Sequence, residues 1–348
     1  MFNLTQGFLD RGISVDIVLD ILVYSPFEKL LPNGAHLVVL GADGFAKRVP
    51  RLVGYLRDSR PDVLLSATHF SNEVACTAKV LSRTGVRLIL SEHTNLSADI
   101  SDSRTRVRRT LLPWTTRNLY PTADAVVAVS NGVAEDMCRV SRLPRKRVQT
   151  IYNPIDRRAL LAMSQEPLSS SWFGSGQPPV VLAIGRLEVQ KNFANLLYAF
   201  RTVRQKREAR LIILGEGSER ARLTALVAEL GLTEDVSLPG FVANPAAYMT
   251  KSAVFAMSSA WEGMPVSLIE ALMLGTPVVS TDCPSGPAEI LDGGKYGRLV
   301  PLDDSDALAR GIDAALDGDR RPADQTWLAQ FDAGMITEKY LDLMSAPS

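Results

Sequence analysis

Short runs of apolar, mostly β-branched residues recur along the whole chain, and they limit its fold more than any other feature of the sequence. Runs that are apolar at nearly every position are typical of strands buried on both faces, which occur in parallel sheets covered by helices. Helix-length segments separate the runs, so the sequence predicts two doubly wound α/β domains. The runs are VDIVL (15–19), HLVVL (36–40), DVLLSA (62–67), RLILSE (87–92), AVVAVS (125–130), VQTIYN (148–153), VVLAIG (180–185), RLIILG (210–215), VSLPG (236–240), VFAMSS (254–259), PVVST (277–281) and GRLVP (297–301).

The length of the chain also favours two domains, because 348 residues exceed what one hydrophobic core usually serves. We expect the first domain over residues 1–156 and the second over 180–325. Between them, residues 157–179 include the run EPLSSSWFGSGQPP, whose content of Ser, Gly and Pro is typical of a linker. Helical periodicity in FDAGMITEKYLDLM predicts a terminal helix within 326–348.

Composition and charge argue against several classes of protein. Basic and acidic residues balance at 38 each, which argues against a nucleic-acid-binding protein. The cysteines Cys76, Cys138 and Cys283 lie far apart without a CxxC pair, so we expect neither a disulfide framework nor a zinc site. Since no apolar run approaches the roughly 20 residues that cross a bilayer, and no signal segment opens the chain, we expect a soluble, cytoplasmic protein.

Two cations follow the first strand of the second domain. Arg186 comes directly after this strand, and Lys191 follows five residues later. The planar fork of an arginine and the point charge of a lysine together suit a diphosphate, and Gly185 lets the backbone pass close to it. Two solvated loop cations would account for the same residues equally well.

A tight turn and a helix follow the strand at 254–259. Residues 262–265 read Glu-Gly-Met-Pro, and we expect a helix from about Val266 to Leu274 with Pro265 near its first turn. The free N–H groups of that turn, with the positive end of the helix dipole, form a site for phosphate. Glu270 lies one turn into the helix, where its carboxylate can accept both hydroxyls of a ribose.

These segments resemble the paired signature of the retaining glycosyltransferases of family 4, GRLxxxKN followed by EGMPxxLxEAxxxGxPVV. The resemblance extends over nearly the whole chain. It implies a GT-B fold, in which two Rossmann-like domains face a cleft, with the acceptor on the first, the nucleotide-sugar on the second, and a last helix that crosses back to the first. Other similar segments are VSNGV (129–133), IYNPID (151–156), GEGSERARL (215–223), LPGF (238–241) and DGGKYGRLVP (292–301).

The resemblance also implies roles for individual residues. Arg186 and Lys191 would hold the donor diphosphate, Glu270 the ribose, and Glu262 would sit by the donor sugar as a catalytic residue. The stretch DCPSGPAEIL (282–291) resembles a subgroup that transfers N-acetylhexosamines or related hexoses from UDP-sugars to lipid-linked or exported glycans. The remaining donor-binding residues would be Gly185, Asn192, Gly240, Phe241, Gly263, Met264 and Pro265.

We expect the reaction to need no metal and no cofactor. The diphosphate leaves with growing negative charge, which Arg186, Lys191 and the helix N-terminus can stabilise. Acidic pairs do occur at Asp304/Asp306 and Asp317/Asp319, but helix capping and solvation explain them.

Histidines follow two strands of the first domain. His93, in SEHTN, matches the position of a family histidine close to the reacting sugar, and the resemblance implies that it binds this sugar as a catalytic residue. A neutral histidine bonded within the sheet edge is the alternative. For His69 a place in the cleft and a structural role are equally compatible, and His36 is interpreted as structural.

A basic segment, SRTRVRRTLLPWTTRNLY (103–120), follows SEHTN. It could lie on an anionic membrane at its cytoplasmic face, grip an acceptor diphosphate, or form an exposed basic face over a packed helix. A polyprenyl-diphosphate-linked acceptor would combine the first two. The residues of this face are Arg104, Arg106, Arg108, Arg109 and Trp114.

The N-terminus departs from the family pattern. Family members begin with a β-strand and a glycine-rich loop, whereas FNLTQGFLDRGISVDIVL resembles the first helix and second strand, so we expect the first sheet to lack its central strand. Either the start lies too far downstream, or the protein binds a nucleotide-sugar without turning it over.

The sequence therefore predicts a retaining, metal-independent glycosyltransferase that moves a hexose or N-acetylhexosamine from a nucleotide-sugar, UDP favoured, to a glycan or lipid-linked acceptor. The alternatives are a catalytically silent nucleotide-sugar-binding protein and a GT-B-fold UDP-sugar epimerase. A dinucleotide-dependent oxidoreductase is disfavoured, because GEGSER has Arg220 in place of the third glycine of that fingerprint.

Overall fold

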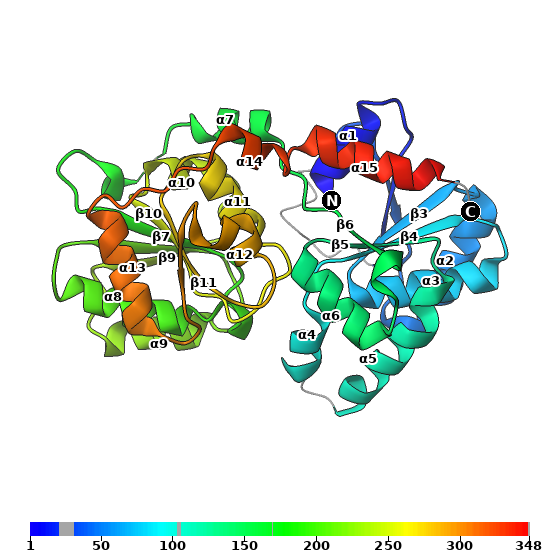
Figure 1. Cartoon of the computed structure of the whole chain (residues 1–348), viewed down its shortest axis with the longest axis horizontal. Coiled ribbons are helices and arrows are strands. Elements are labelled where there is room, and N and C mark those ends of the chain that lie inside the picture. Colours follow the sequence, from blue (N-terminus) through cyan, green and yellow to red (C-terminus); the bar gives the residue numbers. More distant parts are fainter. Residues whose placement is uncertain (21–30, 103–105, 169, 347–348) are drawn as a thin grey trace. The chain divides into compact units, whose positions relative to one another are not determined.

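The computed structural model describes residues 1–20, 31–102, 106–168 and 170–346 (Figure 1). The chain divides into two compact units. Unit 1 comprises Met1–Pro154 and Gln330–Ser348, and unit 2 comprises Ile155–Ala329. Within the described ranges, no helix is both long and apolar enough to span a membrane.

Unit 2 is built on a six-stranded parallel sheet with the order β12-β11-β10-β7-β8-β9. The direction of winding reverses between β7 and β10, and in such sheets ligands bind beyond the carboxyl ends of the strands at the reversal. The strands are β7 (Val180–Ile184), β8 (Arg210–Leu214), β9 (Val236–Gly240), β10 (Val254–Met257), β11 (Val278–Thr281) and β12 (Arg298–Val300).

Helices cover both faces of this sheet (Figure 1). The buried strand residues Val181 and Ala183 share one core with Leu196 and Phe200 of α8, because alternate side chains of a strand point to the same face. The helices are α7 (Arg157–Ser164), α8 (Phe193–Arg204), α9 (Arg220–Glu229), α10 (Ala246–Lys251), α11 (Val266–Met273), α12 (Pro287–Ile290), α13 (Ser305–Leu316) and α14 (Gln325–Ala329).

Unit 1 carries two parallel sheets. One has the order β3-β4-β5-β6, and the other pairs β1 with β2. The strands are β1 (Asp16–Leu19), β2 (His36–Val39), β3 (Val63–Ala67), β4 (Arg87–Glu92), β5 (Ala125–Ala128) and β6 (Val148–Thr150). The helices are α1 (Phe2–Leu9), α2 (Gly44–Ser59), α3 (His69–Ser82), α4 (Leu96–Asp102), α5 (Arg106–Leu119), α6 (Asn131–Ser141) and α15 (Ala333–Ser345), with the 3-10 turn η2 (Tyr120–Thr122).

The two sheets of unit 1 rest on a common helical layer. Val18 of β1 and Leu64 of β3 both pack against the buried cluster that includes Leu52 and Leu56 of α2 and Val74 of α3. Within the described residues, β1 pairs with β2 alone and β3 with β4 alone. The apolar runs of the first domain therefore become strands, but they do not join into one sheet.

Residues 157–179, which we expected to form a linker, belong to unit 2 and are partly helical. The side chain of Asp156 caps α7 by accepting a hydrogen bond from the Ala159 amide. Asn244 then donates to the carbonyl of Met163 at 2.9 Å, which holds the end of α7 near α10. The first part of the expected linker is therefore a helix of unit 2. A capped amphipathic helix forms here because its apolar side can pack against the rest of the unit.

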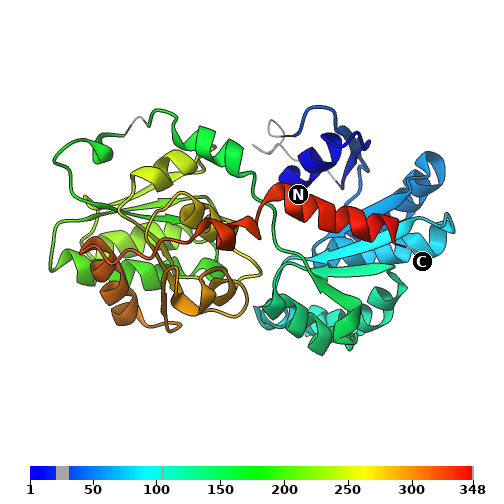
Figure 2. The same ribbon diagram turned by 45° about the horizontal axis from the view of Figure 1, so that its top comes forward.

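The terminal helix α15 lies beside α1 (Figure 2). A Cβ on Gly7 would come 2.2 Å from Thr337 Oγ1, so the glycine allows the two helices to approach closely. Arg11 and Glu338 form an ion pair of 2.7 Å across the same contact. The terminal helix is therefore part of unit 1, although unit 2 precedes it in the sequence.

Candidate functional site

Two loops of unit 2 are locked together at the carboxyl ends of β7 and β10. The amide of Ala260 donates to the Gln190 carbonyl at 2.8 Å, and the Gln190 side chain donates to the Trp261 carbonyl at 2.9 Å. The Ser258 hydroxyl donates to the Lys191 carbonyl at 2.8 Å. These bonds fix the loop after β7 against the loop after β10, at the edge where an α/β sheet binds its ligand.

Lys191 and Glu262 meet inside this junction. Lys191 Nζ lies 2.5 Å from Glu262 Oε1, and the exposed fractions of the two side chains are only 16% and 7%. The Ser259 hydroxyl donates to the same oxygen at 2.7 Å. A Cβ on Gly185 would lie 3.0 Å from Lys191 Cε, so this glycine makes room for the lysine stem. The residues that we expected at the diphosphate and at the sugar therefore form one buried ion pair.

The loop after β8 supports the loop after β7. Gly215 adopts a φ of +143°, and a Cβ there would lie 2.0 Å from the carbonyl oxygen of Gly185. A Cβ on Gly217 would lie 2.4 Å from the carbonyl oxygen of Leu187. Because Gly215 and Gly217 of GEGSER have no side chains, the backbone of the loop after β7 can approach them closely. Arg186, which stands within this supported loop, has an exposed side chain.

The turn at 262–265 leads into α11 as the sequence predicts. Pro265 is the N-cap residue, and no side chain caps the helix. Gly286, with a φ of +95°, packs against the turn, since a Cβ there would come 2.6 Å from Pro265 Cδ. The Glu262 amide also donates to the Pro284 carbonyl at 3.2 Å. The buried turn residues Gly263 and Met264 are held by the same loop, and the N-terminal amides of α11 are uncapped by side chains.

Glu270 lies in the second turn of α11 and is partly buried. Burial raises the pKa of this carboxyl to about 7. A carboxyl held in this way is neutral in part of its population near pH 7, and a ligand that donates hydrogen bonds would favour its charged form.

The other expected donor residues divide into two groups. Gly240, at the end of β9, accepts a hydrogen bond from the Gly215 amide at 2.8 Å, and Phe241 beside it is 43% exposed. These two residues are therefore continuous with the loops described above. Asn192 instead ends the turn before α8 with a φ of +46°, and its side chain donates to Asp303 at 2.8 Å. The side-chain amide of Asn192 is therefore hydrogen-bonded within the protein.

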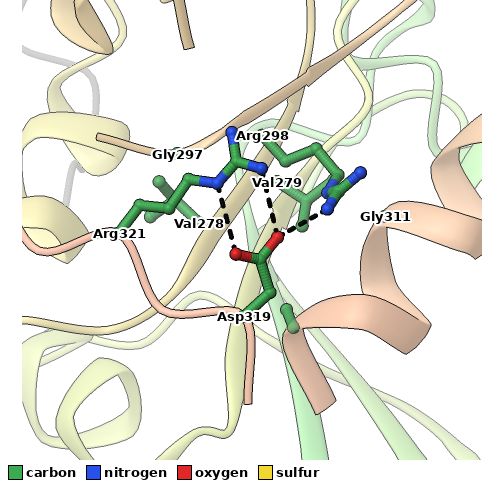
Figure 3. Close-up of a pocket in the computed structure, with 8 residues that line it drawn as sticks. Val278, Val279, Gly297, Arg298, Gly311, Asp319 and Arg321 are labelled. Atoms are coloured by element: carbon green, nitrogen blue, oxygen red, sulfur yellow. Dashed lines mark hydrogen bonds and ion pairs between the residues drawn. The ribbon is translucent and has the colours of Figure 1, made fainter. Parts of the chain in front are cut away.

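Residues of both acidic pairs, Asp304/Asp306 and Asp317/Asp319, have structural partners. Asp304 caps α13 by accepting from the Ala307 amide at 2.7 Å, and Asp317 accepts from Arg207 at 2.6 Å. Figure 3 shows Asp319 bridging Arg298 and Arg321 beside a small pocket. Throughout the described part of the chain, no three His, Cys, Asp or Glu residues are grouped as metal ligands.

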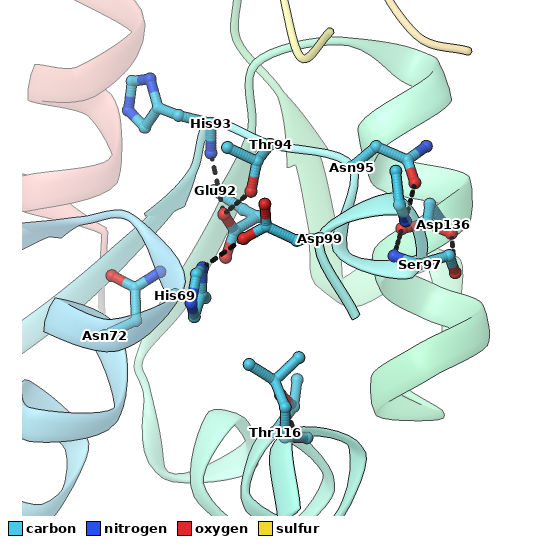
Figure 4. Close-up of polar contacts among 12 residues, drawn as sticks. His69, Asn72, Glu92, His93, Thr94, Asn95, Ser97, Asp99, Thr116 and Asp136 are labelled. Atoms are coloured by element: carbon cyan, nitrogen blue, oxygen red, sulfur yellow. Dashed lines mark hydrogen bonds and ion pairs between the residues drawn. The ribbon is translucent and has the colours of Figure 1, made fainter. Parts of the chain in front are cut away.

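His93 of unit 1 follows β4 directly. Its Nε2 lies 3.0 Å from Ser91 Oγ, which in turn lies 3.2 Å from the Tyr340 hydroxyl of α15. Burial, with a smaller contribution from the N-terminal ammonium group, lowers the pKa of His93 to about 4, so the ring is neutral at pH 7. His69 is buried, and its Nδ1 lies 3.4 Å from Asp99 Oδ2 (Figure 4). The ring of His36 is exposed and lies 3.8 Å from Asp16.

The expected basic face can be described only in part. Arg104 lies outside the described residues, and Arg106, Arg108 and Arg109 belong to α5, whose first-turn side chains are also outside the description. Trp114 on the same helix is 62% exposed. The backbone therefore places three of the four arginines and the tryptophan on one helix.

Sequence reasoning missed several residues of these sites. Ser259 and Gln190 carry no motif of their own, and only the fold brings them to Glu262 and Trp261. Glu92 was visible as a charged residue at the end of an apolar strand, directly before His93. That position is the signal by which it could have been found, because a buried strand end normally excludes an unpaired charge.

Two family profiles match the two parts of the chain. Residues 1–158 match the profile of Glycosyltransferase Family 4, and residues 165–327 match that of Glycosyl transferases group 1. The Rhizobium meliloti lipopolysaccharide core biosynthesis glycosyltransferase LpsE is 30% identical over 241 residues, which are 65% of this chain and 68% of LpsE.

A second relative is the N-acetylgalactosamine-N,N'-diacetylbacillosaminyl-diphospho-undecaprenol 4-alpha-N-acetylgalactosaminyltransferase of Campylobacter jejuni. It is 35% identical over 202 residues, which are 58% of this chain and 53% of that protein. The match therefore spans about half the length of this relative.

Among solved structures, that of Anabaena Alr3699/HepE in complex with UDP and glucose aligns with a TM-score of 0.78 at 19% identity, covering 99% of this chain and 95% of the other. This match shows a common fold. The two α/β units with parallel sheets thus define a protein of the GT-B fold. The matched profiles and relatives show that the chain belongs to the family 4 glycosyltransferases, glycosyl transferases group 1.

Proposed function

We propose that this protein is a retaining glycosyltransferase that moves a hexose or N-acetylhexosamine from a UDP-sugar to a glycan or polyprenyl-diphosphate-linked acceptor. The observation that carries the proposal is the ion pair between Lys191 and Glu262, held in the loops beside α11. A cation, a carboxylate and a helix N-terminus without a side-chain cap here lie at the carboxyl edge of one sheet, which is a place for an anionic ligand.

Each residue of this arrangement has a proposed task. Lys191 would share its charge between Glu262 and the donor diphosphate, and Arg186, whose side chain is exposed, would bind the same group. As the bond between the sugar and the diphosphate breaks, these cations and the α11 amides would stabilise the departing charge. This chemistry needs no metal ion. Glu262 would contact the sugar, Glu270 the ribose, and His93 of unit 1 the reacting sugar.

The relatives support the choice of substrates. The name of the Campylobacter jejuni protein specifies a diphospho-undecaprenol acceptor and transfer of N-acetylgalactosamine. The name of LpsE specifies lipopolysaccharide core synthesis, and HepE was solved with UDP and glucose. For this chain we propose an acceptor of the same chemical kind, reached at the cytoplasmic face of the membrane, with α5 and its exposed Trp114 toward the lipid.

The test is calorimetric titration of the whole chain with UDP, followed by a transfer assay with UDP-hexoses and polyprenyl-diphosphate-linked acceptors. We expect UDP to bind, and Arg186→Ala to weaken binding about tenfold, since a lost charged hydrogen bond costs roughly 1.5–3 kcal/mol. Lys206→Ala is the matched control, because Lys206 is an exposed cation of unit 2 paired with Asp313. No UDP binding, or equal affinity in both variants, would contradict the proposal.

A catalytically silent binding protein is the second candidate. The strands of unit 1 lie in two sheets, and the His93 ring is engaged with Ser91 inside that unit. UDP binding without turnover of any donor would favour this candidate, whereas measurable transfer would exclude it.

A further inference from the structure

Glu92 is the last residue of β4, and its side chain is completely buried. Its carboxyl group accepts hydrogen bonds from three residues, and Figure 4 draws those from His93 and Thr94. The Tyr120 hydroxyl donates to Oε2 at 2.9 Å, the His93 amide to Oε1 at 3.1 Å, and the Thr94 hydroxyl to Oε1 at 3.3 Å. Two of the three donors belong to the turn that carries His93.

We propose that Glu92 is a positioning residue, whose carboxylate holds the turn at His93 and Thr94 and thereby the place of the His93 ring. This inference rests on the proposed function, in which His93 contacts the reacting sugar. The ionised carboxylate is the form that binds all three donors most strongly, because hydrogen bonds to a charged acceptor are stronger than those to a neutral one. Protonation of Glu92 removes this charge and turns one carboxyl oxygen into a donor, so it weakens the hydrogen bonds that hold the turn.

The rest of the network limits how the turn can respond. The Tyr120 hydroxyl already accepts a hydrogen bond from the Asn72 side chain at 3.4 Å, so its proton points toward Glu92. On the other side, the His93 ring is held by Ser91 and, through it, by Tyr340 of α15. Glu92 holds the His93 backbone and Ser91 holds its ring, so the ring keeps its place only while both contacts are present.

The acid–base behaviour of Glu92 makes the inference testable by pH. Burial raises the pKa of Glu92 to about 7, although the hydrogen bonds from Tyr120, His93 and Thr94 lower it. The charged carboxylate is therefore present above pH 7, and its hold on the turn weakens as the pH falls through this value. The titratable groups around this part of unit 1 are the N-terminal ammonium group, His69 and Cys76 of α3, His93, Asp99 of α4, Tyr120 of η2, Asp136 of α6 and Tyr340 of α15.

The first test is the pH profile of transfer by the whole chain. We expect kcat to fall below about pH 7 while KM for the donor changes little. Glu92→Gln should lower kcat at pH 8 about tenfold and remove this acidic limb, because one charged acceptor is lost and nothing remains to titrate. Tyr120→Phe should move the limb to higher pH, since the Tyr120 hydrogen bond lowers the pKa of Glu92. Asp136→Asn, which removes another buried carboxylate away from His93, is the control and should keep the limb.

The second test does not depend on activity or on a folded Glu92 variant. The chain has three histidines, so ¹⁵N-histidine labelling gives few amide signals to assign. We expect the His93 amide of the unmodified protein to shift with a midpoint near pH 7, and the midpoint to rise in Tyr120→Phe. A His93 amide that does not titrate, or a Glu92→Gln protein that keeps the acidic limb, would overturn the inference. Absence of UDP binding and transfer would instead overturn the proposed function, while the amide titration would still decide the role of Glu92.

Discussion

Lys191 Nζ and Glu262 Oε1 lie 2.5 Å apart in unit 2, although 71 positions of sequence separate the two residues. The pair is nearly buried and shares the Ser259 hydroxyl. A diphosphate bound at this place would compete with Glu262 for the ammonium group. In the proposed function, the pair would therefore link the stability of unit 2 to the binding of the donor.

Removing one partner should therefore have two separable effects. Lys191→Ala leaves Glu262 buried without its cation, and we expect a loss of about 3 kcal/mol in the free energy of unfolding. Glu262→Gln frees the lysine, so we expect UDP affinity to be retained or increased while transfer falls at least about tenfold. Urea denaturation and calorimetry measure the two effects. Stability of Lys191→Ala equal to that of Lys206→Ala would contradict the assignment.

Transfer should survive removal of metal ions. The proposed site stabilises the leaving diphosphate with Arg186, Lys191 and the amides of α11. We expect initial rates after dialysis against EDTA to equal those of the untreated protein, with added Mg²⁺ or Mn²⁺ changing them less than about twofold. An absolute requirement for either ion would show that the charge is stabilised in another way.

Glu270 should make the stability of unit 2 depend on pH. Burial raises the pKa of its carboxyl to about 7 in the folded protein, above the value of an exposed glutamate. The folded state thus binds its proton more tightly than the unfolded state, and stability is lost as the pH rises from about 4.5 through 7. Glu270→Gln should gain stability relative to the unmodified protein between pH 5 and 8 in urea titrations. Glu229→Gln, at an exposed position of α9, should show no such trend.

Glu270→Ala should also separate recognition of the ribose from recognition of the phosphates. We expect weaker binding of UDP, because the proposed hydrogen bonds to the ribose are lost. Inorganic diphosphate, which has no ribose, should bind the variant and the unmodified protein equally. Equal loss for both ligands in calorimetry would place the effect on the diphosphate site instead.

Gly215→Ala should destabilise unit 2 strongly. A Cβ at this position would meet the Gly185 carbonyl oxygen at 2.0 Å, and the φ of +143° is unfavourable for alanine. We expect a loss of more than about 2 kcal/mol in the free energy of unfolding. Gly54→Ala is the control, because Gly54 lies in α2 with open space around its Cβ and should gain about 0.5–1 kcal/mol. Similar values for the two variants would contradict this account.

The two units should differ in hydrogen exchange. All but the last residue of β7 are buried at the centre of a six-stranded sheet, whereas β1 is half exposed and pairs with β2 alone in the described chain. Exposed hydrogen bonds and few buried contacts lower the free energy of local opening. We expect amides of β7 and β8 to exchange at least about tenfold more slowly than those of β1 and β2. Equal protection would show that β1 and β2 are stabilised by contacts beyond this sheet.

The sequence by itself determined the local elements. The apolar run VVLAIG becomes β7, and Pro265 begins α11 at Val266, because backbone hydrogen bonding, φ restriction and burial periodicity act over a few neighbouring residues. The sequence also indicated that the residues after β7 and β10 lie close together, since parallel strands present their carboxyl ends at one edge of the sheet.

Only the tertiary structure decided which of these residues meet. In the folded unit 2, Lys191 pairs with Glu262, and the Asn192 side chain donates a hydrogen bond to Asp303. In unit 1 the Tyr340 hydroxyl lies 3.2 Å from Ser91 Oγ, although 249 positions of sequence separate the two residues. The tertiary structure also distributes the strands of unit 1 over two sheets and makes residues 157–164 a helix of unit 2. Such contacts depend on how whole helices and sheets pack, and that packing is set by side-chain volume and burial summed over the unit, which no short segment contains.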